Sequence, residues 1–407
     1  MRIIHTADWH LGQYFYTKSR APEHQAFLDW LIEQITLHQV DALIVAGDIF
    51  DNGSPPSYAR EMLNRFVVAL RTTGCQLVLL AGNHDAVATL NESRDLLACL
   101  NTRLIANACD DPNQQVFPLN TRQGIPGAIL CAIPFLRPRD ILRSQAGQSG
   151  SEKQLALQDA ISGHYAQCYQ HACSLRETLG LPLPIIATGH LTTVGVTASE
   201  AVRDIYIGSL DAYPVQAFPP ADYIALGHIH RPQRVGHSEH IRYSGSPIAL
   251  SFDELGSEKS VALIEFQQGT LTQITLLPIP VTQPMRLIKG SLTEIEQQLR
   301  ALPVPEKEQR IWLDIEIATD TYLSDMQQRI QQLAQALPVD VLLMRRNREQ
   351  RLQAITREKK ETLDELSPRD VFERRLALTD IESEQQERLR PLFDGMVLDV
   401  KEGEPQA

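Results

Sequence analysis

The stretch ALGHIHRP, residues 225–232, decides how the fold of this chain is interpreted. An apolar run ends at Gly227, and two histidines follow, His228 and His230, separated by one residue. If the segment continues as a strand, residues two apart face the same side, so both imidazoles can reach a shared site. Other motifs of the sequence indicate what that site contains.

Four more polar motifs follow apolar runs, and four of the five motifs begin with glycine. The four additional motifs are Asp8-Trp-His10, Gly47-Asp48-Ile-Phe-Asp51, Gly82-Asn83-His84-Asp85 and Gly189-His190. We predict strands at 2–6, 42–46, 76–81, 128–133, 184–188 and 223–226, and amphipathic helices at 23–39 and 57–73. This alternation predicts an α/β domain with α+β layering. Because ligands collect beyond the carboxyl ends of parallel strands, we expect the five motifs to form one site.

The residue types in these motifs indicate a metal centre. Histidine and carboxylate ligands suit Mn, Fe or Zn, and the six cysteines contain no C-x-x-C pair that would indicate structural zinc. The candidate ligands are Asp8, His10, Asp48, Asn83, His190, His228 and His230. They are too many for one ion and enough for two if a carboxylate bridges, and Asp48 is the best bridge. Two divalent ions with two carboxylates leave positive charge for a hydroxide and a phosphodiester.

Each of these residues alone has an ordinary interpretation. Asp8, Asp48 and Asn83 could be turn or helix-cap residues, which is the usual role of such residues at strand ends. Five motifs in order, each after an apolar run, favour the metal centre instead. Trp9, inside the first motif, is expected to pack in the core.

The ordered pattern D-x-H, G-D-x-x-D, G-N-H-[DE], G-H and G-H-x-H resembles the calcineurin-like metallophosphoesterases. The sequence is more similar still to the SbcD family of bacterial nuclease subunits, through residues 199–203 (SEAVR), 222–233 (DYIALGHIHRPQ) and 241–254 (IRYSGSPIALSFDE). The resemblance is strong over residues 1–280. It implies a β-sandwich flanked by helices, a small α/β capping domain and a C-terminal helical tail.

The resemblance also implies individual roles. One ion would be held by Asp8, His10, Asp48 and His230, and the second by Asp48, Asn83, His190 and His228. His84 would meet the scissile phosphate or protonate the leaving oxygen. The alternative for His84 is that it only orients Asn83. Asp51 would orient His10, since metal-bound imidazoles commonly have such a partner.

A proline-containing stretch at 278–284 predicts a domain boundary. We expect a nuclease domain at 1–280, a capping (DNA-recognition) domain at 281–344 with the order strand, helix, strand, helix, strand, and a charged linker with C-terminal helices at 345–407. By resemblance those helices dock on SbcC, an SMC-like coiled-coil ATPase; the alternative is that they pack back on the body. The basic cluster Arg345–Lys360 is either a solvated helix face or a phosphate-binding patch. Residues 57–73 carry a core face, and the resemblance places a homodimer contact, within a heterotetramer, in this area.

Composition limits the partners. The chain of 407 residues has a formal net charge of −12, so DNA contact must come from a local patch, a bound metal or a partner. No signal segment or membrane span is apparent, and scattered cysteines suggest reduced thiols, so we expect a cytoplasmic protein, nucleoid-associated when on DNA. No Walker A motif occurs, which predicts no nucleotide site on this chain.

We therefore expect an ATP-regulated, Mn-dependent DNA nuclease subunit, with Mg or Fe as alternative metals. The resemblance implies 3′→5′ exonuclease action on duplex ends and endonuclease action on single strands and hairpins, in DNA repair, recombination and replication. A small-substrate phosphatase or cyclic-nucleotide phosphodiesterase would share the five motifs without needing the capping domain or tail. A non-enzymatic scaffold is a third hypothesis, and the intact ligand set argues against it.

Overall fold

The structure is a computed structural model that describes residues 1–109, 111–142, 149–203, 205, 212–303, 309–318, 323–346, 372, 389 and 391–393. The chain divides into two compact units, 1–316 with 321–345, and 317–320 with 346–407. The predicted linker, the basic cluster beyond Arg346 and most of the predicted C-terminal helices lie outside the described residues. In the second unit, the rings of Phe372 and Phe393 stack with centroids 4.0 Å apart.

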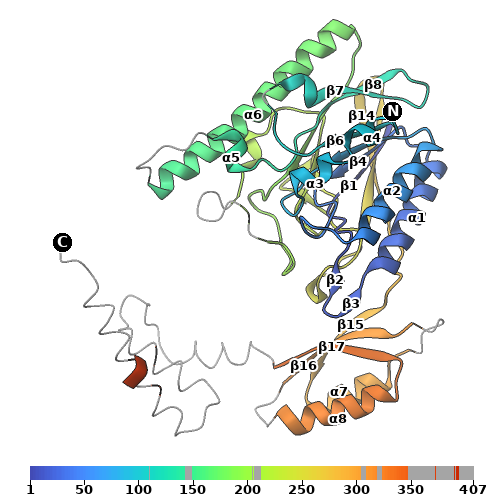
Figure 1. The fold of residues 1–407 in the computed structure, drawn as a ribbon, viewed down its shortest axis with the longest axis vertical. Helices are drawn as coiled ribbons and strands as arrows, with labels where there is room; N and C mark the ends of the chain where they lie inside the picture. Colours follow the sequence, from blue (N-terminus) through green and yellow to red (C-terminus); the bar gives the residue numbers. More distant parts are fainter. Residues whose placement is uncertain are drawn as a thin grey trace. The chain divides into compact units, whose positions relative to one another are not determined.

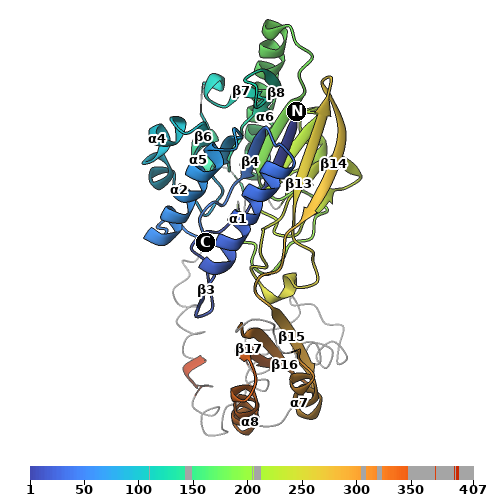
Figure 2. The same ribbon diagram turned by 90° about the vertical axis from the view of Figure 1, so that its right-hand side faces the viewer.

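Two six-stranded sheets form a sandwich, as the family resemblance implies (Figures 1 and 2). The sequence predicts six of these twelve strands, β1, β4, β5, β8, β9 and β10. In the order β14-β13-β1-β4-β5-β6, the first contains β1 (Arg2–Thr6), β4 (Ala42–Ala46), β5 (Gln76–Leu80), β6 (Thr102–Ile105), β13 (Ser260–Gln267) and β14 (Thr270–Pro278). In the order β11-β12-β10-β9-β8-β7, the second contains β7 (Val116–Asn120), β8 (Pro126–Cys131), β9 (Ile185–His190), β10 (Tyr223–Gly227), β11 (Gln233–Val235) and β12 (Ser238–Tyr243). Neighbouring strands from β1 to β6 run parallel, as do β8, β9, β10 and β12. Each sheet therefore gathers several carboxyl ends at one edge.

Strand β4 shows why the sheets pack as they do. Its five residues are all apolar and all buried. Leu43 and Val45 face the core shared with the helices, whereas Ile44 belongs to the cluster between the sheets, with Ile186 and Ala225 of the second sheet. A strand that is apolar on both faces needs cover on both faces, and the helices and the second sheet supply it.

Helices cover the outer faces. The helix α1 (Ala21–Leu37) lies beside α2 (Ser57–Arg71) against the first sheet, and α6 (Gly150–Leu179), the long green helix of Figure 1, packs on the second. Short elements complete this part: α3 (Val87–Asn91), α4 (Arg94–Ala98), α5 (Pro138–Ile141), the hairpin β2 (Tyr14–Phe15) and β3 (Lys18–Ser19), and three 3-10 turns, η1 (Pro112–Gln114), η2 (Val215–Ala217) and η3 (Phe252–Glu254). No helix of the described part is long and apolar enough to cross a membrane.

Some predicted boundaries differ from the observed ones. The first helix begins at Ala21, two residues before the predicted start, because Pro22 suits the first helical turn. Strand β9 extends to His190, so this imidazole lies on the strand itself. Strand β10 ends at Gly227, and His228 has a positive φ of 95°. The idea that the strand continues through His228 and His230 is therefore wrong.

Residues 285–346, which we call the small domain, follow the predicted element order. They form β15 (Met285–Gly290), α7 (Leu292–Arg300), β16 (Ile311–Ile317), α8 (Leu323–Gln335) and β17 (Val339–Arg346), with strand order β15-β16-β17. Trp312 of β16 stacks on Phe15 of the β2–β3 hairpin, with ring centroids 5.8 Å apart. The buried guanidinium of Arg20 lies 5.0 Å from the Phe15 ring centre and 5.4 Å from that of Trp312. The functional boundaries at 280 and 344 remain a prediction.

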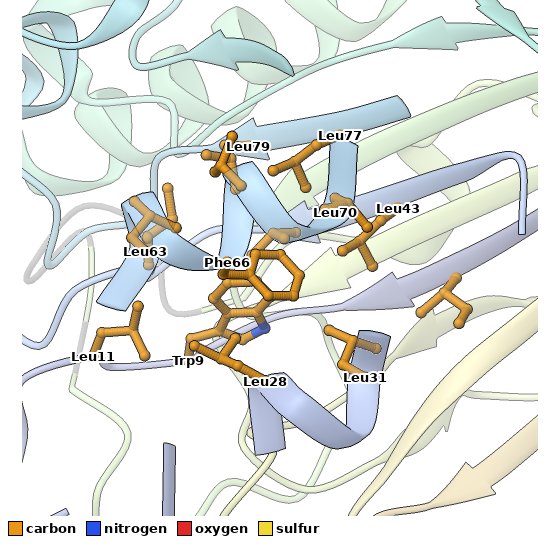
Figure 3. Packing of buried hydrophobic residues seen from close by; sticks show 14 of the residues in the cluster. Trp9, Leu11, Leu28, Leu31, Leu43, Leu63, Phe66, Leu70, Leu77 and Leu79 are labelled. Atoms are coloured by element: carbon orange, nitrogen blue, oxygen red, sulfur yellow. The ribbon is translucent and has the colours of Figure 1, made fainter. Parts of the chain in front are cut away.

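Trp9 packs in the core, as expected. It is fully buried, and its ring meets Phe66 edge to face at 5.3 Å between centroids (Figure 3). Its indole N–H donates to the hydroxyl of Thr6 at 3.0 Å. The residue between Asp8 and His10 thus anchors the first motif to the helix-side core.

This packing generates a stability prediction within one helix. Phe66→Ala should lower the free energy of unfolding by about 3–5 kcal/mol, because Phe66 is 4% exposed and its removal leaves a cavity against Trp9. Val68→Ala, at a position 57% exposed, should change it by less than about 0.5 kcal/mol. Chemical denaturation followed by circular dichroism measures both, and equal losses would contradict the assignment of Phe66 to the core.

Candidate metal centre

The structure brings all seven predicted ligands and His84 together. The first sheet contributes Asp8, His10, Asp48, Asn83 and His84 from the loops after β1, β4 and β5. The second contributes His190 from the end of β9, and His228 and His230 from the loop after β10. Three groups have ligand atoms within 4.8 Å of one another: Asp8, His10 and His230; His10, Asp48 and His84; Asp48, His190 and His228. Every motif identified in the sequence therefore meets at one place.

Asp48 lies at the centre of this arrangement. Its Oδ2 is 3.2 Å from Nε2 of His190 and 3.7 Å from Nε2 of His10. Its Oδ1 accepts the backbone N–H of His84 at 2.9 Å. Burial favours the protonated acid, but the neighbouring histidines, His190 first, hold the pKa of Asp48 well below its ordinary value. One carboxylate thus contacts both histidine groups.

Asn83 joins the group around His190. Its Oδ1 is 2.9 Å from Nε2 of His190 and 3.1 Å from Nδ1 of His228. The other ring nitrogen of His190, Nδ1, donates to the carbonyl of Ala46 at 3.0 Å, so Nε2 is the atom presented to the site. Burial lowers the pKa of His190, but the Asp48 and Asp8 carboxylates and the hydrogen bond to the Ala46 carbonyl together raise it to about 9. The site therefore favours positive charge at this point.

Asp8 connects the two sheets. Its oxygens lie 2.8 and 3.1 Å from the backbone nitrogen of His228, whose N–H they accept. The residue is fully buried, and burial raises the pKa of its carboxyl. A backbone N–H from the second sheet thus holds an acid of the first.

The loops that carry the ligands are sharply bent. Asp8, His10 and Asp48 have φ between 49° and 54°, and non-glycine residues rarely adopt this left-handed region. Such strain is concentrated at functional sites. A Cβ on Gly82 would lie 2.1 Å from Oδ1 of Asp48, so only glycine allows the third motif to approach the carboxylate.

His84 and Asp51 lie beside His10. Nδ1 of His84 donates to the Asp51 carbonyl at 2.7 Å, and its ring meets that of His10 edge to face at 4.6 Å. The Asp51 carboxylate lies 3.4 Å from Nδ1 of His10. Both residues therefore lie at the site next to a predicted ligand, and their roles remain predictions.

Two acids of the site were not assigned roles from the sequence. The buried carboxylate of Asp85 accepts backbone N–H groups of Gly82, Ile49 and Phe50 at 2.9, 3.1 and 3.0 Å, and so ties two motif loops together. Burial, with the nearby charge of Asp48, raises the pKa of Asp85 to about 6. Glu254 lies 3.2 Å from Nδ1 of His230. The sequence contained a clue to each acid: Asp85 is the last position of the pattern G-N-H-[DE], and Glu254 ends the family-like segment 241–254.

The residues present fit divalent metal ions. Nε2 of His10 and Nε2 of His228 are buried and make no hydrogen bond. Buried polar atoms in native proteins are nearly always satisfied, so these nitrogens indicate a ligand that a divalent cation can provide. Imidazole nitrogens with carboxylate and amide oxygens are a donor set for such ions.

Comparisons with known proteins agree with this site. The calcineurin-like phosphoesterase model matches residues 1–232, and a model described as the type 5 capsule protein repressor C-terminal domain matches residues 281–380. The SbcD subunit of the SbcCD nuclease of Escherichia coli (strain K12) is 61% identical, covering 97% of this chain and 97% of the relative. The chain belongs to the SbcD family. The SbcD relative from Rhodobacter capsulatus is 36% identical, covering 75% of this chain and 77% of the relative, and that from Bacillus subtilis is 29% identical, covering 80% and 81%.

Membership of the SbcD family determines the class of chemistry. The chain is a metal-dependent phosphodiesterase of the nuclease-subunit type, and its His and Asp clusters fit the divalent ions that such hydrolases use. A non-enzymatic scaffold with a degenerate metal site would lack some of the seven candidate ligands, and all seven are present. The scaffold hypothesis is therefore not supported.

Metal addition should stabilise the folded chain measurably. Mn²⁺ at a hundredfold excess over its Kd should stabilise the native state by about 2.7 kcal/mol for each bound ion, because it binds the assembled site and not the unfolded chain. Thermal denaturation should show a higher melting temperature that EDTA reverses. Asp48→Asn should remove most of the shift, whereas Asp159→Asn, on the exposed face of α6, should keep it. A full shift in Asp48→Asn would exclude Asp48 from metal binding.

Proposed function

We propose that this chain is the Mn²⁺-dependent nuclease subunit of a complex with the ATPase SbcC, and that it hydrolyses DNA phosphodiesters at a two-ion centre. The observation that carries the proposal is the position of Asp48 between two histidine groups, 3.2 Å from His190 and 3.7 Å from His10. Mg²⁺ and Fe²⁺ are the alternative metals, since the same nitrogen and oxygen donors accept them.

The proposed ligand sets share Asp48. One comprises Asp8, His10, Asp48 and His230, and the other Asp48, Asn83, His190 and His228. Their grouping is supported by the close approach of Asp8, His10 and His230 and of Asp48, His190 and His228. When bound, a pair of divalent ions supplies an activated water and stabilises negative charge on phosphate oxygens.

His84 is the proposed catalytic side chain outside the ligand sets. Its Nδ1 is committed to the Asp51 carbonyl, which leaves Nε2 for the substrate. Held this way, the neutral ring can contact the scissile phosphate through Nε2, and the imidazolium form can deliver its Nε2 proton to the leaving oxygen. The alternative role, orientation of Asn83, has less support, because the hydrogen bond of His84 goes to Asp51.

The finer activity follows the family: 3′→5′ exonuclease action on duplex ends and endonuclease action on single strands and hairpins, in DNA repair and recombination. A chain of net charge −12 repels DNA overall, so DNA binding must depend on the ions, on local cations and on a partner. We place the protein in the cytoplasm, where its six free thiols stay reduced.

The partner contacts are proposed on the same basis. SbcC would dock on the C-terminal helices, and Leu392, 64% exposed, offers an apolar side chain there. The small domain would recognise DNA, and a homodimer would form in the area of α2. Arg345, the first residue of the basic cluster, pairs with Asp314 at 2.8 Å and so serves the small domain.

The nuclease assay that tests the function uses a labelled hairpin duplex with Mn²⁺. The chain with SbcC and ATP should cut the hairpin, and His84→Ala should lose at least about a hundredfold in rate while still binding two Mn²⁺ ions, because His84 is outside both ligand sets. His237→Ala, at an exposed histidine outside the five motifs, controls for loss of an imidazole. Wild-type-like cutting by His84→Ala would remove this residue from catalysis. Hydrolysis of a small phosphodiester with no DNA cutting under any condition would favour the small-substrate phosphodiesterase.

The docking proposal has its own test. Deletion of residues 367–407 should abolish co-purification with SbcC and leave hydrolysis of a small phosphodiester unchanged, since the metal centre lies within residues 8–230. Affinity purification of the co-expressed pair measures the first, and a chromogenic phosphodiester measures the second. Retention of SbcC by the truncated chain would contradict docking through the tail.

A further inference from the structure

A buried acid outside the five motifs contacts one of the proposed ligands. Glu254, at the end of η3, is fully buried, and its Oε1 lies 3.2 Å from Nδ1 of His230. A carboxylate without solvent is costly unless it is paired and hydrogen-bonded. Its surroundings show how that cost is met.

Both oxygens of Glu254 are held by donors from different segments. Oε2 accepts from Nζ of Lys259 at 2.6 Å and from the backbone N–H of Leu250 at 3.0 Å. Oε1 accepts from the hydroxyl of Ser199 at 2.7 Å. With these partners the carboxylate is ionised and fixed in position, and the His230 ring is a further partner.

His230 is held at two points as a result. Glu254 accepts a hydrogen bond from the Nδ1–H of the ring, and Lys259 donates to the backbone carbonyl of His230 at 2.9 Å. The proton on Nδ1 leaves Nε2 as the nitrogen available to the group of Asp8 and His10. A carboxylate partner also increases the basicity of the ligating nitrogen.

The histidines on the other side of the centre have support of a different kind. The Nδ1 of His190 donates to a backbone carbonyl, that of Ala46. The ring of His228 has Asn83 at 3.1 Å as its hydrogen-bond neighbour. The two proposed ions therefore differ in the support behind their histidines.

We propose that Glu254, fixed by Lys259 and Ser199, is a positioning residue that orients His230 and strengthens binding of one ion of the pair but not the other. The inference rests on the proposed function only in taking His230 as a metal ligand. According to this proposal, Glu254 affects metal affinity without touching the ion, and its substitution should weaken the binding of only one of the two ions.

Calorimetric titration with Mn²⁺ tests the selectivity. Glu254→Gln should weaken one of two Mn²⁺ affinities by about 10- to 100-fold, as removal of outer partners of metal-bound histidines does, and leave the other within about threefold. Glu258→Gln, the same change at an exposed acid four residues on, should leave both affinities unchanged. Two unchanged affinities in Glu254→Gln, or an equal fall in both, would overturn the proposal.

A second variant separates orientation from charge balance. If Glu254 served only to neutralise Lys259, then Glu254→Gln with Lys259→Met would restore the melting temperature and both affinities, because no buried charge remains unpaired. We expect the double variant to fold with a cooperative transition and still lose the same affinity. Recovery of both affinities would assign Glu254 a purely structural role and overturn the proposal.

His230→Ala distinguishes failure of the ligand assignment from failure of this inference. It should lose the same ion, and Glu254→Gln added to it should cause no further change. Two intact Mn²⁺ affinities in His230→Ala would remove His230 from the ligand set, and with it the proposed two-ion assignment. Loss of an ion in His230→Ala with no effect of Glu254→Gln would overturn the role of Glu254 alone.

Discussion

Burial of acidic side chains where the two sheets meet is the constraint on which the rest of the site depends. Asp8 and Asp48 have almost no exposed surface, and a buried carboxylate is stable only with donors or cations around it. Backbone N–H groups of His228 and His84 supply part of that need, and imidazoles of both sheets surround the rest. The same two acids therefore hold loops of both sheets together through hydrogen bonds, and their buried negative charge favours binding of divalent ions.

The core keeps these loops in place by alternation of polar and apolar residues. Trp9 is buried against α1 and α2, while its neighbours on either side turn into the site. Ile229 is likewise fully buried between His228 and His230. Because each apolar residue is held by packing, the adjacent ligands have little freedom, which a metal site of defined geometry requires. The left-handed backbone at three of the ligands is sustained by the same packing.

The supports behind the imidazoles are of different kinds. A backbone carbonyl holds His190, another holds His84, and a carboxylate holds His230. A carbonyl dipole fixes the tautomer of a histidine, whereas an ionised carboxylate also changes the electron density at the opposite nitrogen. The two proposed ions can therefore be held unequally for a reason beyond their own ligands, namely the different partners behind the histidines.

Local sequence determined six strands of the two large sheets, the order of the small-domain elements, the five motifs and the identity of the candidate ligands, because continuous apolar runs and short spacings are local patterns. The other six strands of these two sheets were not predicted. Tertiary structure alone decided which atoms face one another. Glu254 lies 24 residues from His230, and Asp85 reaches a backbone nitrogen 36 residues away, so no local pattern could pair them. The positive φ of His228 was also invisible, because L-residues disfavour it and only the contacts of the folded chain sustain it. The sequence gives the residue type at each position, whereas the direction of a buried side chain depends on every segment packed around it.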